Sequence, residues 1–584
     1  MCRASAADTW GSTSFFAISG FLLTADLLRA AQEGTFSASR FYLGRVRRIA
    51  PALVLVSAAT TPFALWLMLP DHLENFGQSL LATLLSANNV LAWQTTGYWA
   101  TESSFKPLLH TWSLGVEEQF YLVLPPLVAL GLRIEVRRGP LVVLAVLSAA
   151  SLAASEWGRA HASEANFYLL PSRFWEIGAG SLTAILRPSM LARTTARTRH
   201  TLVGISLVAL SASLISMGPE WALPGLPSSI PVGATCLVLA LGGVAGPGVV
   251  LTARPLVWTG VVSYSLYLWH QPAFAFLRLV SLEEPSTPMF LAVLAPIGAL
   301  SFLTWRWVEQ PCRDRSRVST RTLLLLTTLP GAALVALGAI LHTTSGLVAL
   351  RPEVAEGGAW LGTQQNIAYN LAPRELSSVA FDAAERDRNI LVIGNSFARD
   401  FINMMNEAGA WDAAVVGYAE RPLCAPWDAA LTARVSAAGS VVLGSGVTER
   451  ELPCARRAVQ QARALGVAHV LVLGIKGFGY SNEAVMLLPP ERRYAYRAPL
   501  DPAVISADAA ARRALAPEVY VSFVETLDDG AHTVPVFTPD RQLISQDRRH
   551  LTPAGARFVG REVLALPQLA WLRALAPGEG ARAE

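Results

Sequence analysis

Residues 106–121, Lys106-Pro-Leu-Leu-His-Thr-Trp-Ser-Leu-Gly-Val-Glu-Glu-Gln-Phe-Tyr121, put three ionisable side chains at the start of an apolar helical pattern. These are His110, Glu117 and Glu118, and the apolar pattern runs on to about Leu132. A membrane span needs roughly 20 apolar residues. Because ionisable groups inside a membrane are costly, they mark functional sites by default. The stretch therefore predicts a membrane protein that handles a polar group within the bilayer.

The composition of the whole chain agrees with a membrane protein. Of the 584 residues, 52% are hydrophobic and 15% are charged, and the mean hydropathy is +0.38. These values are too apolar for a soluble protein of this size. The apolar runs end near residue 342, and the rest has the composition of one globular domain. The net charge of +4 is small and the basic residues lie in particular loops, so no nucleic-acid partner is expected.

Ten membrane spans are predicted. They lie at about residues 13–29, 48–69, 108–131, 140–157, 168–186, 201–217, 230–247, 256–279, 287–307 and 322–342. Every odd-numbered loop is the basic one: arginine is concentrated after the first, third, fifth and ninth spans, and the seventh span is followed by Arg254 alone. By the positive-inside rule these loops are cytoplasmic, and the C-terminal tail then lies on the outer face of the membrane.

Ten spans with an outer tail also place the N-terminus outside. Residues 1–12 contain neither the apolar region nor the cleavage site of a signal peptide. We therefore expect one transmembrane helix to be missing upstream of Met1. The alternative is that one predicted span has been merged with its neighbour or split in two.

The tail predicts an α/β domain. Short apolar runs typical of buried strands lie at residues 389–394, 440–444, 469–474 and 534–537. Because helical patterns alternate with these runs, a parallel, doubly wound sheet is expected. Ligands of such sheets bind beyond the carboxyl ends of the strands, where Ser396, Gly444 and Gly474 fall.

The tail also contains the residue types of a nucleophilic relay. A serine hydroxyl needs a histidine to take its proton and an acid to orient that histidine, and Ser396, His550 and Asp547 fit these roles. The N–H groups of Ser396 and Gly444 and the amide of Asn482 would then stabilise an oxyanion. The alternative interpretations are that Ser396 is a helix N-cap and that His550 is a surface histidine.

Two of the five cysteines, Cys424 and Cys454, lie in the tail. A disulfide between them would close a loop of about 30 residues and stabilise the domain by about 3 kcal/mol, and disulfides persist outside the cytoplasm. The alternative is two unrelated buried thiols. No cysteine or histidine spacing is typical of a zinc site, so no metal is expected.

Six motifs in order along the chain resemble those of the membrane-bound acyltransferase 3 family. They are Phe15–Thr24 (Phe-Phe-Ala-Ile-Ser-Gly-Phe-Leu-Leu-Thr), Phe41–Pro51, His110–Tyr121, Phe167–Glu176, Ser263–His270 and Val308–Arg313. The tail resembles the periplasmic SGNH-hydrolase-like domain fused to one branch of that family. The resemblance implies a membrane domain over residues 1–342, a linker over 343–388 and an SGNH-like domain over 389–584.

The resemblance implies transfer of an acyl group, most simply acetyl, from cytoplasmic acyl-CoA to a hydroxyl of an envelope carbohydrate such as O-antigen, exopolysaccharide or peptidoglycan. The protein would lie in the inner or plasma membrane with its tail outside. Acyl-CoA would be a donor substrate, and no permanently bound cofactor is expected. Membrane-site candidates are His110, Glu117, Glu118, Arg45, Arg47, Arg48, Arg173 and Glu176. The first three arginines suit CoA phosphates or topology anchoring equally well, whereas Arg173 and Glu176 share a helix face as a buried pair or pore lining.

Two departures from the family pattern stand out. We expect the first helix of the family, with its arginine and terminal histidine, to be missing from this chain, and Gly394-Asn-Ser-Phe397 replaces the usual Gly-Asp-Ser-His block. Two other functions remain open: a transporter or flippase with a sugar-binding tail, and a carbohydrate esterase on a membrane anchor. His270 is expected to be structural or gating.

Overall fold

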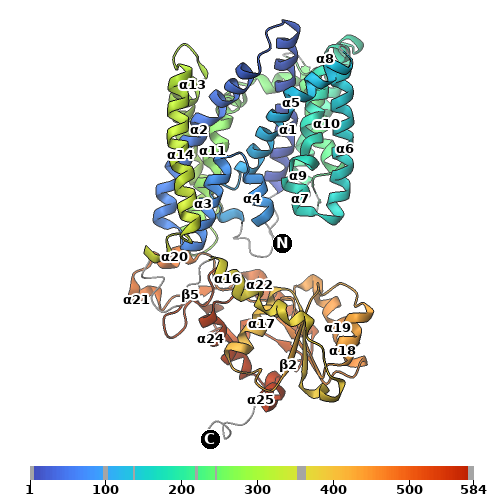
Figure 1. Cartoon of the computed structure of the whole chain (residues 1–584), viewed down its shortest axis with the longest axis vertical. Coiled ribbons are helices and arrows are strands. Elements are labelled where there is room, and N and C mark those ends of the chain that lie inside the picture. The colour runs from blue at the N-terminus through green and yellow to red at the C-terminus, as the bar shows by residue number, and fades with distance from the viewer. Residues whose placement is uncertain are drawn as a thin grey trace. The chain divides into compact units, whose positions relative to one another are not determined.

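The computed structural model describes residues 6–95, 103–135, 138–216, 221, 223–243, 246–350 and 363–575, drawn as a ribbon in Figure 1. Part of the predicted linker, residues 351–362, lies outside the described residues. The chain divides into two compact units. The first comprises residues 1–66, 72–277 and 286–343, and the second comprises 67–71, 278–285 and 344–584.

The first unit is helical. The helices at the predicted spans are α1 (Ala6–Gln32), α2 (Ala38–Leu67), α5 (Thr111–Ile134), α6 (Gly139–His161), α8 (Leu170–Arg193), α9 (Ala196–Ser216), α10 (Ser229–Leu241), α11 (Arg254–Leu279), α12 (Thr287–Thr304) and α14 (Thr320–Thr343). Between them lie α3 (Pro70–Leu84), α4 (Asn88–Thr95), α7 (Ser163–Tyr168) and α13 (Gln310–Arg313). A helix overlaps each of the ten predicted spans. The helices α3 and α4 occupy a stretch that was expected to be a loop, because Leu73, Phe76 and Leu80 recur at helical spacing and are buried.

Among the described helices, six are long and apolar enough to cross a membrane. They are α1, α2, α6, α9, α12 continued through α13, and α14; a bent pair, Leu226–Leu241 with Gly246–Thr252, would make a seventh. The helices α5, α8 and α11 fall outside this set because they carry charged and polar side chains, among them Glu117 and Arg173. The count of ten spans therefore stays a prediction.

Glycines let α1 and α8 approach closely. An ideal Cβ on Gly20 would lie 1.9 Å from the carbonyl oxygen of Ile177, and one on Gly180 would lie 1.9 Å from that of Ala17. Small residues at such crossings bring helix backbones together where water supplies no driving force. The crossing fixes the part of α8 that carries Arg173 and Glu176.

The second unit is built on a five-stranded parallel sheet. Its strands, in the order β2-β1-β3-β4-β6, are β2 (Val415–Glu420), β1 (Asn389–Gly394), β3 (Ser440–Gly444), β4 (His469–Leu473) and β6 (Tyr520–Val521). The strands predicted at 389–394 and 440–444 have the predicted bounds, and the one at 469–474 is one residue shorter. The strands β2 and β6 were not predicted.

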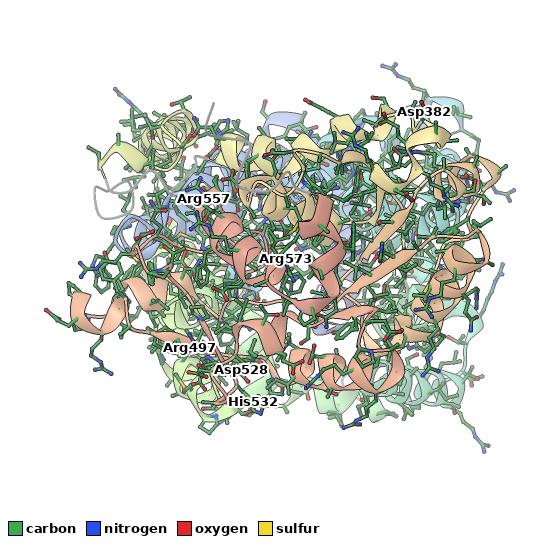
Figure 2. The ribbon with its side chains drawn as sticks, turned by 90° about the horizontal axis from the view of Figure 1, so that it is seen from below. Asp382, Arg497, Asp528, His532, Arg557 and Arg573 are labelled. Atoms are coloured by element: carbon green, nitrogen blue, oxygen red, sulfur yellow. A yellow bond between two sulfur atoms is a disulfide. The ribbon has the colours of Figure 1, made fainter. Side chains whose placement is uncertain are left out.

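The strand predicted at 534–537 does not join this sheet. It contributes β7 (Thr533–Pro535), which pairs antiparallel with β5 (Arg497–Pro499), and its assignment to the parallel sheet is wrong. The guanidinium of Arg497 donates to the carbonyl oxygen of Thr533 at 2.9 Å and so binds the two short strands together. Figure 2 labels Arg497, Asp528 and His532 around this pair.

Helices cover both faces of the parallel sheet. Ile390 and Val392 of β1 pack with α17 (Ser396–Glu407) and α24 (Pro553–Leu564), whereas Leu391 and Ile393 face the opposite cluster. The helices of that second cluster are α18 (Ala429–Ser436), α19 (Leu452–Ala464) and α22 (Pro502–Ala514). The remaining helices are α16 (Thr363–Leu371), α20 (Asn482–Met486), α21 (Pro490–Arg493), α23 (Phe523–Leu527) and α25 (Ala570–Leu575). The expected doubly wound arrangement is thus present.

Cys424 and Cys454 form a disulfide with 5.0 Å between their Cα atoms. The bridge predicted from the sequence is confirmed, and the alternative of two unrelated thiols is excluded. The closed loop contains α18 and β3, so the bridge constrains a central strand of the sheet.

We expect the double substitution Cys424→Ser/Cys454→Ser to lower the free energy of unfolding of the second unit by about 3 kcal/mol, because the unfolded chain regains loop entropy. Proteolysis of the purified full-length protein across a urea series would measure this as a lower midpoint. The control Cys236→Ser, at a free cysteine, should leave the midpoint unchanged. Equal midpoints for the double variant and the wild type would contradict the prediction.

Candidate functional site

The sequence order of the strands reverses between β1 and β3. In this topology the chain leaves β1 toward one side of the sheet and β3 toward the other, which opens a crevice at their carboxyl ends. The last residues of the two strands, Gly394 and Gly444, are paired. Beyond them, the N–H of Asn395 donates to the carbonyl oxygen of Gly444 at 3.1 Å. Asn395 and Ser445 therefore begin the two segments that border the crevice, and Ser396 follows Asn395.

Both glycines are required at this place. Gly394 has a φ of +152°, and an ideal Cβ on it would lie 2.1 Å from the carbonyl oxygen of Gly444. A Cβ on Gly444 would lie 2.5 Å from Cα of Ala398. The absence of these side chains lets the first turn of α17 rest against the end of β3.

Ser396 is the first residue of α17 and is 4% exposed. The N-cap of this helix is Asn395, whose side-chain oxygen accepts from the N–H of Phe397 at 3.0 Å. The interpretation of Ser396 as the N-cap is therefore excluded. Its hydroxyl makes no hydrogen bond to any residue that the structure describes, and it lies in the positive field of the helix N-terminus.

His550 and Asp547 lie together in one turn, within the segment 545–550 that we call the acid–base loop. The Nδ1 atom of His550 is in short hydrogen-bonding contact with Oδ2 of Asp547. The other carboxylate oxygen accepts from the N–H groups of His550 at 2.7 Å and Arg549 at 3.0 Å. His550 is 6% exposed, which excludes a surface histidine. The acid and base halves of the relay are thus assembled, whereas the Ser396 hydroxyl is not hydrogen-bonded to them.

The carboxyl group of Asp547 is held in its ionised form. Burial alone would raise the pKa of Asp547, but the His550 imidazole and the N–H groups of His550 and Arg549 outweigh it and hold the pKa well below its usual range. An ionised acid at this place fixes the Nδ1–H tautomer of His550 and leaves Nε2 as the basic atom.

Asn482 has a different role from the one predicted. Its side-chain nitrogen donates to the carbonyl oxygens of Ser545 and Gln546, both at 2.9 Å. Both amide N–H bonds are therefore used to hold the acid–base loop, and in this arrangement none is left for an oxyanion. The predicted donors at Ser396 and Gly444 stay predictions.

Sequence reasoning missed three further residues near the crevice. Ser445 follows β3, and its hydroxyl is buried and makes no hydrogen bond to the part of the chain that the structure describes. Lys476 follows β4 and is paired with Asp400 of α17 in the interior. The signal that could have found Ser445 and Lys476 is their place directly beyond the carboxyl ends of central strands.

The helical unit buries an ion pair between α8 and α1. Arg173 lies 3.1 Å from Glu176 and both side chains are 0% exposed. The hydroxyl of Thr13 donates to Glu176 at 3.2 Å, and Arg173 also lies over the rings of Phe167 and Trp112. The predicted face-sharing of Arg173 and Glu176 is observed, with the contacts of a structural pair.

The two glutamates of α5 contact different helices. Glu117 is 3% exposed and accepts short hydrogen bonds from Ser19 of α1 and Tyr121. Glu118 accepts from Ser86, before α4, at 2.5 Å. Glu117 therefore connects α5 to α1, and Glu118 connects α5 to the turn before α4.

His110 precedes α5 and lies against α11. Its ring is 4.9 Å from that of Tyr267 and 5.3 Å from that of His270. Both ring nitrogens are buried. The Tyr267 hydroxyl donates to the carbonyl oxygen of His110 at 2.6 Å, so the backbone that carries this buried imidazole is held against α11.

The three arginines of α2 that were predicted as site candidates are not equivalent. Arg47 is 3% exposed and donates to the carbonyl oxygens of Cys312 and Val318 at 2.9 and 2.8 Å. It therefore holds the connection between α13 and α14 and is not placed to bind a donor molecule. Arg45 lies over the rings of Phe41 and Tyr121, and Arg48 is partly exposed.

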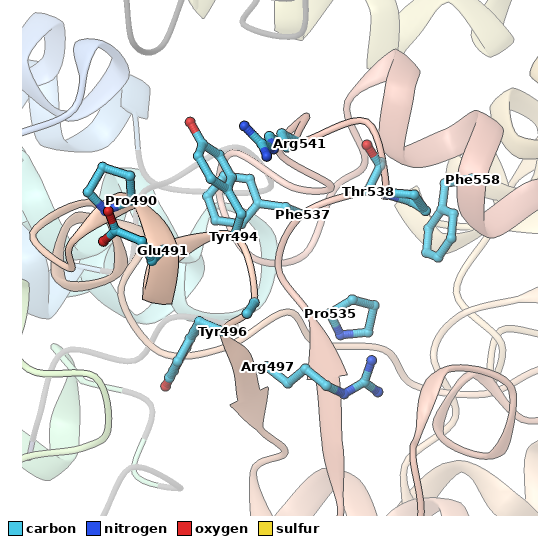
Figure 3. Close-up of a pocket in the computed structure, with 12 residues that line it drawn as sticks. Pro490, Glu491, Tyr494, Tyr496, Arg497, Pro535, Phe537, Thr538, Arg541 and Phe558 are labelled. Carbon is cyan, nitrogen blue, oxygen red and sulfur yellow. The ribbon is translucent and has the colours of Figure 1, made fainter.

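The second unit contains an open pocket of about 750 Å³ (Figure 3). Tyr494 lies edge-on to Phe537 with 5.1 Å between ring centres, and the guanidinium of Arg541 lies 5.2 Å over the Tyr494 ring. Glu491 and Thr538 add carboxylate and hydroxyl groups to the lining. An aromatic platform beside charged and hydroxyl groups suits a ligand with one apolar face and polar edges. Among the described residues, no group of three or more His, Cys, Asp or Glu side chains is arranged to hold a metal ion.

Comparison with known proteins gives the same family for the helical unit. A family model described as an acyltransferase domain matches residues 4–306. BcsY of Komagataeibacter xylinus, named as a candidate membrane-bound transacylase, is 26% identical over 305 residues, which cover 52% of this chain and 76% of that protein.

Peptidoglycan O-acetyltransferase OatA of Listeria monocytogenes is 22% identical over 325 residues, which cover 53% of this chain and 52% of that protein. YrhL of Bacillus subtilis, named as a candidate peptidoglycan O-acetyltransferase, is 26% identical over 328 residues, or 52% of this chain and 50% of that protein. The matches thus span about half the length of these two relatives. No solved structure matches the chain significantly.

We expect a fluorophosphonate probe to label Ser396 in the purified protein, and Asp547→Asn to slow this labelling by on the order of 10²–10⁴-fold. The reason is that the amide cannot hold His550 in the tautomer that accepts the serine proton. The rate constant of covalent labelling measures the effect, and Ser396→Ala is the control without a nucleophile. Labelling of Asp547→Asn at the wild-type rate would contradict the relay.

We expect Arg173→Met to lower the stability of the detergent-solubilised protein by about 3–5 kcal/mol, since it leaves Glu176 buried without its cation. The double variant Arg173→Met/Glu176→Gln should regain most of this loss. Thermal unfolding midpoints would show the difference. A single variant as stable as the double variant would disprove the structural role of the pair.

Proposed function

Because the chain belongs to the acyltransferase family, whose model matches more than half of its length, we propose that it transfers an acyl group, most simply acetyl, to a hydroxyl of an envelope carbohydrate. The donor is cytoplasmic acyl-CoA. The protein lies in the inner or plasma membrane as a multi-pass protein of ten spans. Its second unit is an SGNH-type domain outside the cytoplasm, on the same side as the polysaccharide.

The observation that carries this proposal is the arrangement at the strand crevice. Ser396, a candidate nucleophile at a helix N-terminus, lies just after β1, and a His550–Asp547 pair with a buried imidazole lies on another loop. This is the set of groups that acyl transfer through a serine ester requires. A transporter with a sugar-binding tail does not require a buried serine hydroxyl that is left without a hydrogen bond to the described residues, or an oriented imidazole.

The reaction at this site has two balanced steps. The Ser396 oxygen attacks the acyl carbonyl while His550 Nε2 takes the hydroxyl proton. The group that delivered the acyl chain then leaves and takes that proton from His550. The sugar hydroxyl then attacks the serine ester, His550 takes its proton, and the proton returns to the Ser396 oxygen. The helix N-terminus and the N–H groups at Ser396 and beside Gly444 stabilise the oxyanion of each tetrahedral intermediate.

Two further features support the assignment of substrates. Arg45 and Arg48 flank the predicted cytoplasmic loop, where cations suit the phosphates of CoA. The pocket lined by Tyr494, Phe537 and Arg541 suits a sugar, whose ring C–H groups pack on aromatic faces while its hydroxyls reach charged side chains (Figure 3). The lipid bilayer is the third partner. The buried imidazole of His110 and the carboxyl of Glu117 provide polar groups along the helical unit for the transmembrane stage.

The disulfide between Cys424 and Cys454 supports the outer location of the second unit, because structural disulfides form and persist outside the cytoplasm. The concentration of arginine in alternate loops gives the same orientation.

The proposal predicts that Ser396→Ala abolishes base-labile O-acetyl groups on envelope polysaccharide in cells that lack the native protein. The wild-type chain in the same cells is the reference, and Ser436→Ala, at an exposed serine of α18, is a matched control. Alkaline release of acetate from purified polysaccharide measures the result. A transporter would show no loss with Ser396→Ala, and an esterase would show more O-acetyl than the wild type; either result would overturn acyl transfer.

A further inference from the structure

The acid–base loop is held by one short segment after β4, residues 474–482, which we call the β4 segment. Asn482 donates to the carbonyl oxygens of Ser545 and Gln546. The N–H of Phe478 donates to the carbonyl oxygen of Arg548 at 3.0 Å. Three of the six carbonyl groups of the loop are thus bound by these two residues of the same segment, which fixes the path of the backbone on both sides of Asp547.

Lys476 is the member of the β4 segment that also reaches the helix of Ser396. Its ammonium lies 2.7 Å from the carbonyl oxygen of Arg549 and 2.5 Å from Oδ2 of Asp400 in α17. It also lies 4.1 Å from the ring centre of Phe397. Lys476 is 4% exposed and Asp400 is 0% exposed. One buried cation therefore contacts both α17 and the acid–base loop.

These contacts lie directly beside the reacting groups. Asp400 is four residues after Ser396 on α17, so the two share a helix face. Phe397 is the next residue after Ser396, and Arg549 is the residue before His550. The position of Lys476 consequently sets how far the turn of His550 lies from the N-terminus of α17.

A buried ion pair contributes little to stability by itself, because desolvation of both charges offsets their attraction.

The residue type at position 476 also supports a specific role. Lysine occurs in this chain only at positions 106 and 476, and the other basic residues are arginines. A compact ammonium can donate to a carboxylate and a carbonyl on different sides, whereas a planar guanidinium has a fixed fork.

We propose that Lys476 is a positioning residue for acyl transfer: by binding Asp400 of α17 and the carbonyl oxygen of Arg549, it sets the approach of the His550 imidazole to the Ser396 hydroxyl. This inference rests on the proposed function of Ser396, His550 and Asp547. Lys476 contacts neither the acyl group nor the nucleophile and acts only through the two segments that it joins.

Two double variants separate the effect of the hydrogen bond to Arg549 from the effect of removing the buried charges of Lys476 and Asp400. Lys476→Met/Asp400→Asn and Lys476→Gln/Asp400→Asn both remove the same two buried charges and keep similar side-chain volumes. They differ in that the glutamine amide can still donate to the carbonyl oxygen of Arg549, whereas the methionine thioether cannot. A general loss of folding would therefore slow both variants alike.

The measurement is the rate constant for fluorophosphonate labelling of Ser396 in the purified full-length protein, taken from pH 5 to pH 9, with the thermal midpoint recorded for each variant. We expect the methionine variant to be labelled about 100-fold more slowly than the wild type, since a misplacement of about 1 Å costs that much. The glutamine variant should stay within about tenfold of the wild type and keep its pH profile.

Equal rates for the two double variants, whether both fast or both slow, would overturn the positioning role. Ser396→Ala separates this result from failure of the proposed function. If the wild type is not labelled, or is labelled equally after Ser396→Ala, the serine mechanism itself is wrong. If labelling depends on Ser396 and the two double variants agree, only the inference about Lys476 is wrong.

Discussion

The close approach of α17 to the end of β3 is the contact on which the site of the second unit depends. It exists because Gly394 and Gly444 have no side chains, so the backbone can turn at once from β1 into the helix. That turn places Ser396 in the first helical position and leaves capping to Asn395. Any Cβ at Gly444 would meet the backbone of Ala398 and displace the helix N-terminus from the crevice. The absence of side chains at Gly394 and Gly444 thus determines the position of the Ser396 hydroxyl.

The strands and the acid–base turn were predictable because their signals are local. Buried apolar runs at 389–394 and 440–444 have one interpretation at that length, and Asp547 and His550 are only three residues apart. The roles of Asn482, Arg47 and Lys476 were not predictable, since each depends on a partner distant in the sequence. Likewise β2 and β6 gave weak patterns, because β2 is an edge strand and β6 pairs through two residues.

In the helical unit, buried charged side chains depend on partners from other helices. Its most polar helices, α5 and α8, bury Glu117, Arg173 and Glu176, and each side chain finds its partners within the unit. Thr13 of α1 contacts Glu176 of α8, and Ser19 of α1 contacts Glu117 of α5. The crossing at Gly20 and Gly180 brings α1 close to α8. The described residues of α6, α9 and α14 bury no charged side chain, which explains why length and hydropathy identify these helices as candidate spans and not α5 and α8.

The disulfide also has a mechanical consequence. A folded domain that is pulled at its two ends experiences tension along its backbone. The 30-residue interval between Cys424 and Cys454 is removed from the extensible contour, which at about 3.4 Å per residue amounts to roughly 100 Å of chain that cannot be drawn out. Because β3 lies inside this interval, a pull on the ends of the unit can extend the flanking segments but cannot stretch the covalent loop to its full length. The strand next to the nucleophile is shielded from full extension by a bond rather than by packing alone.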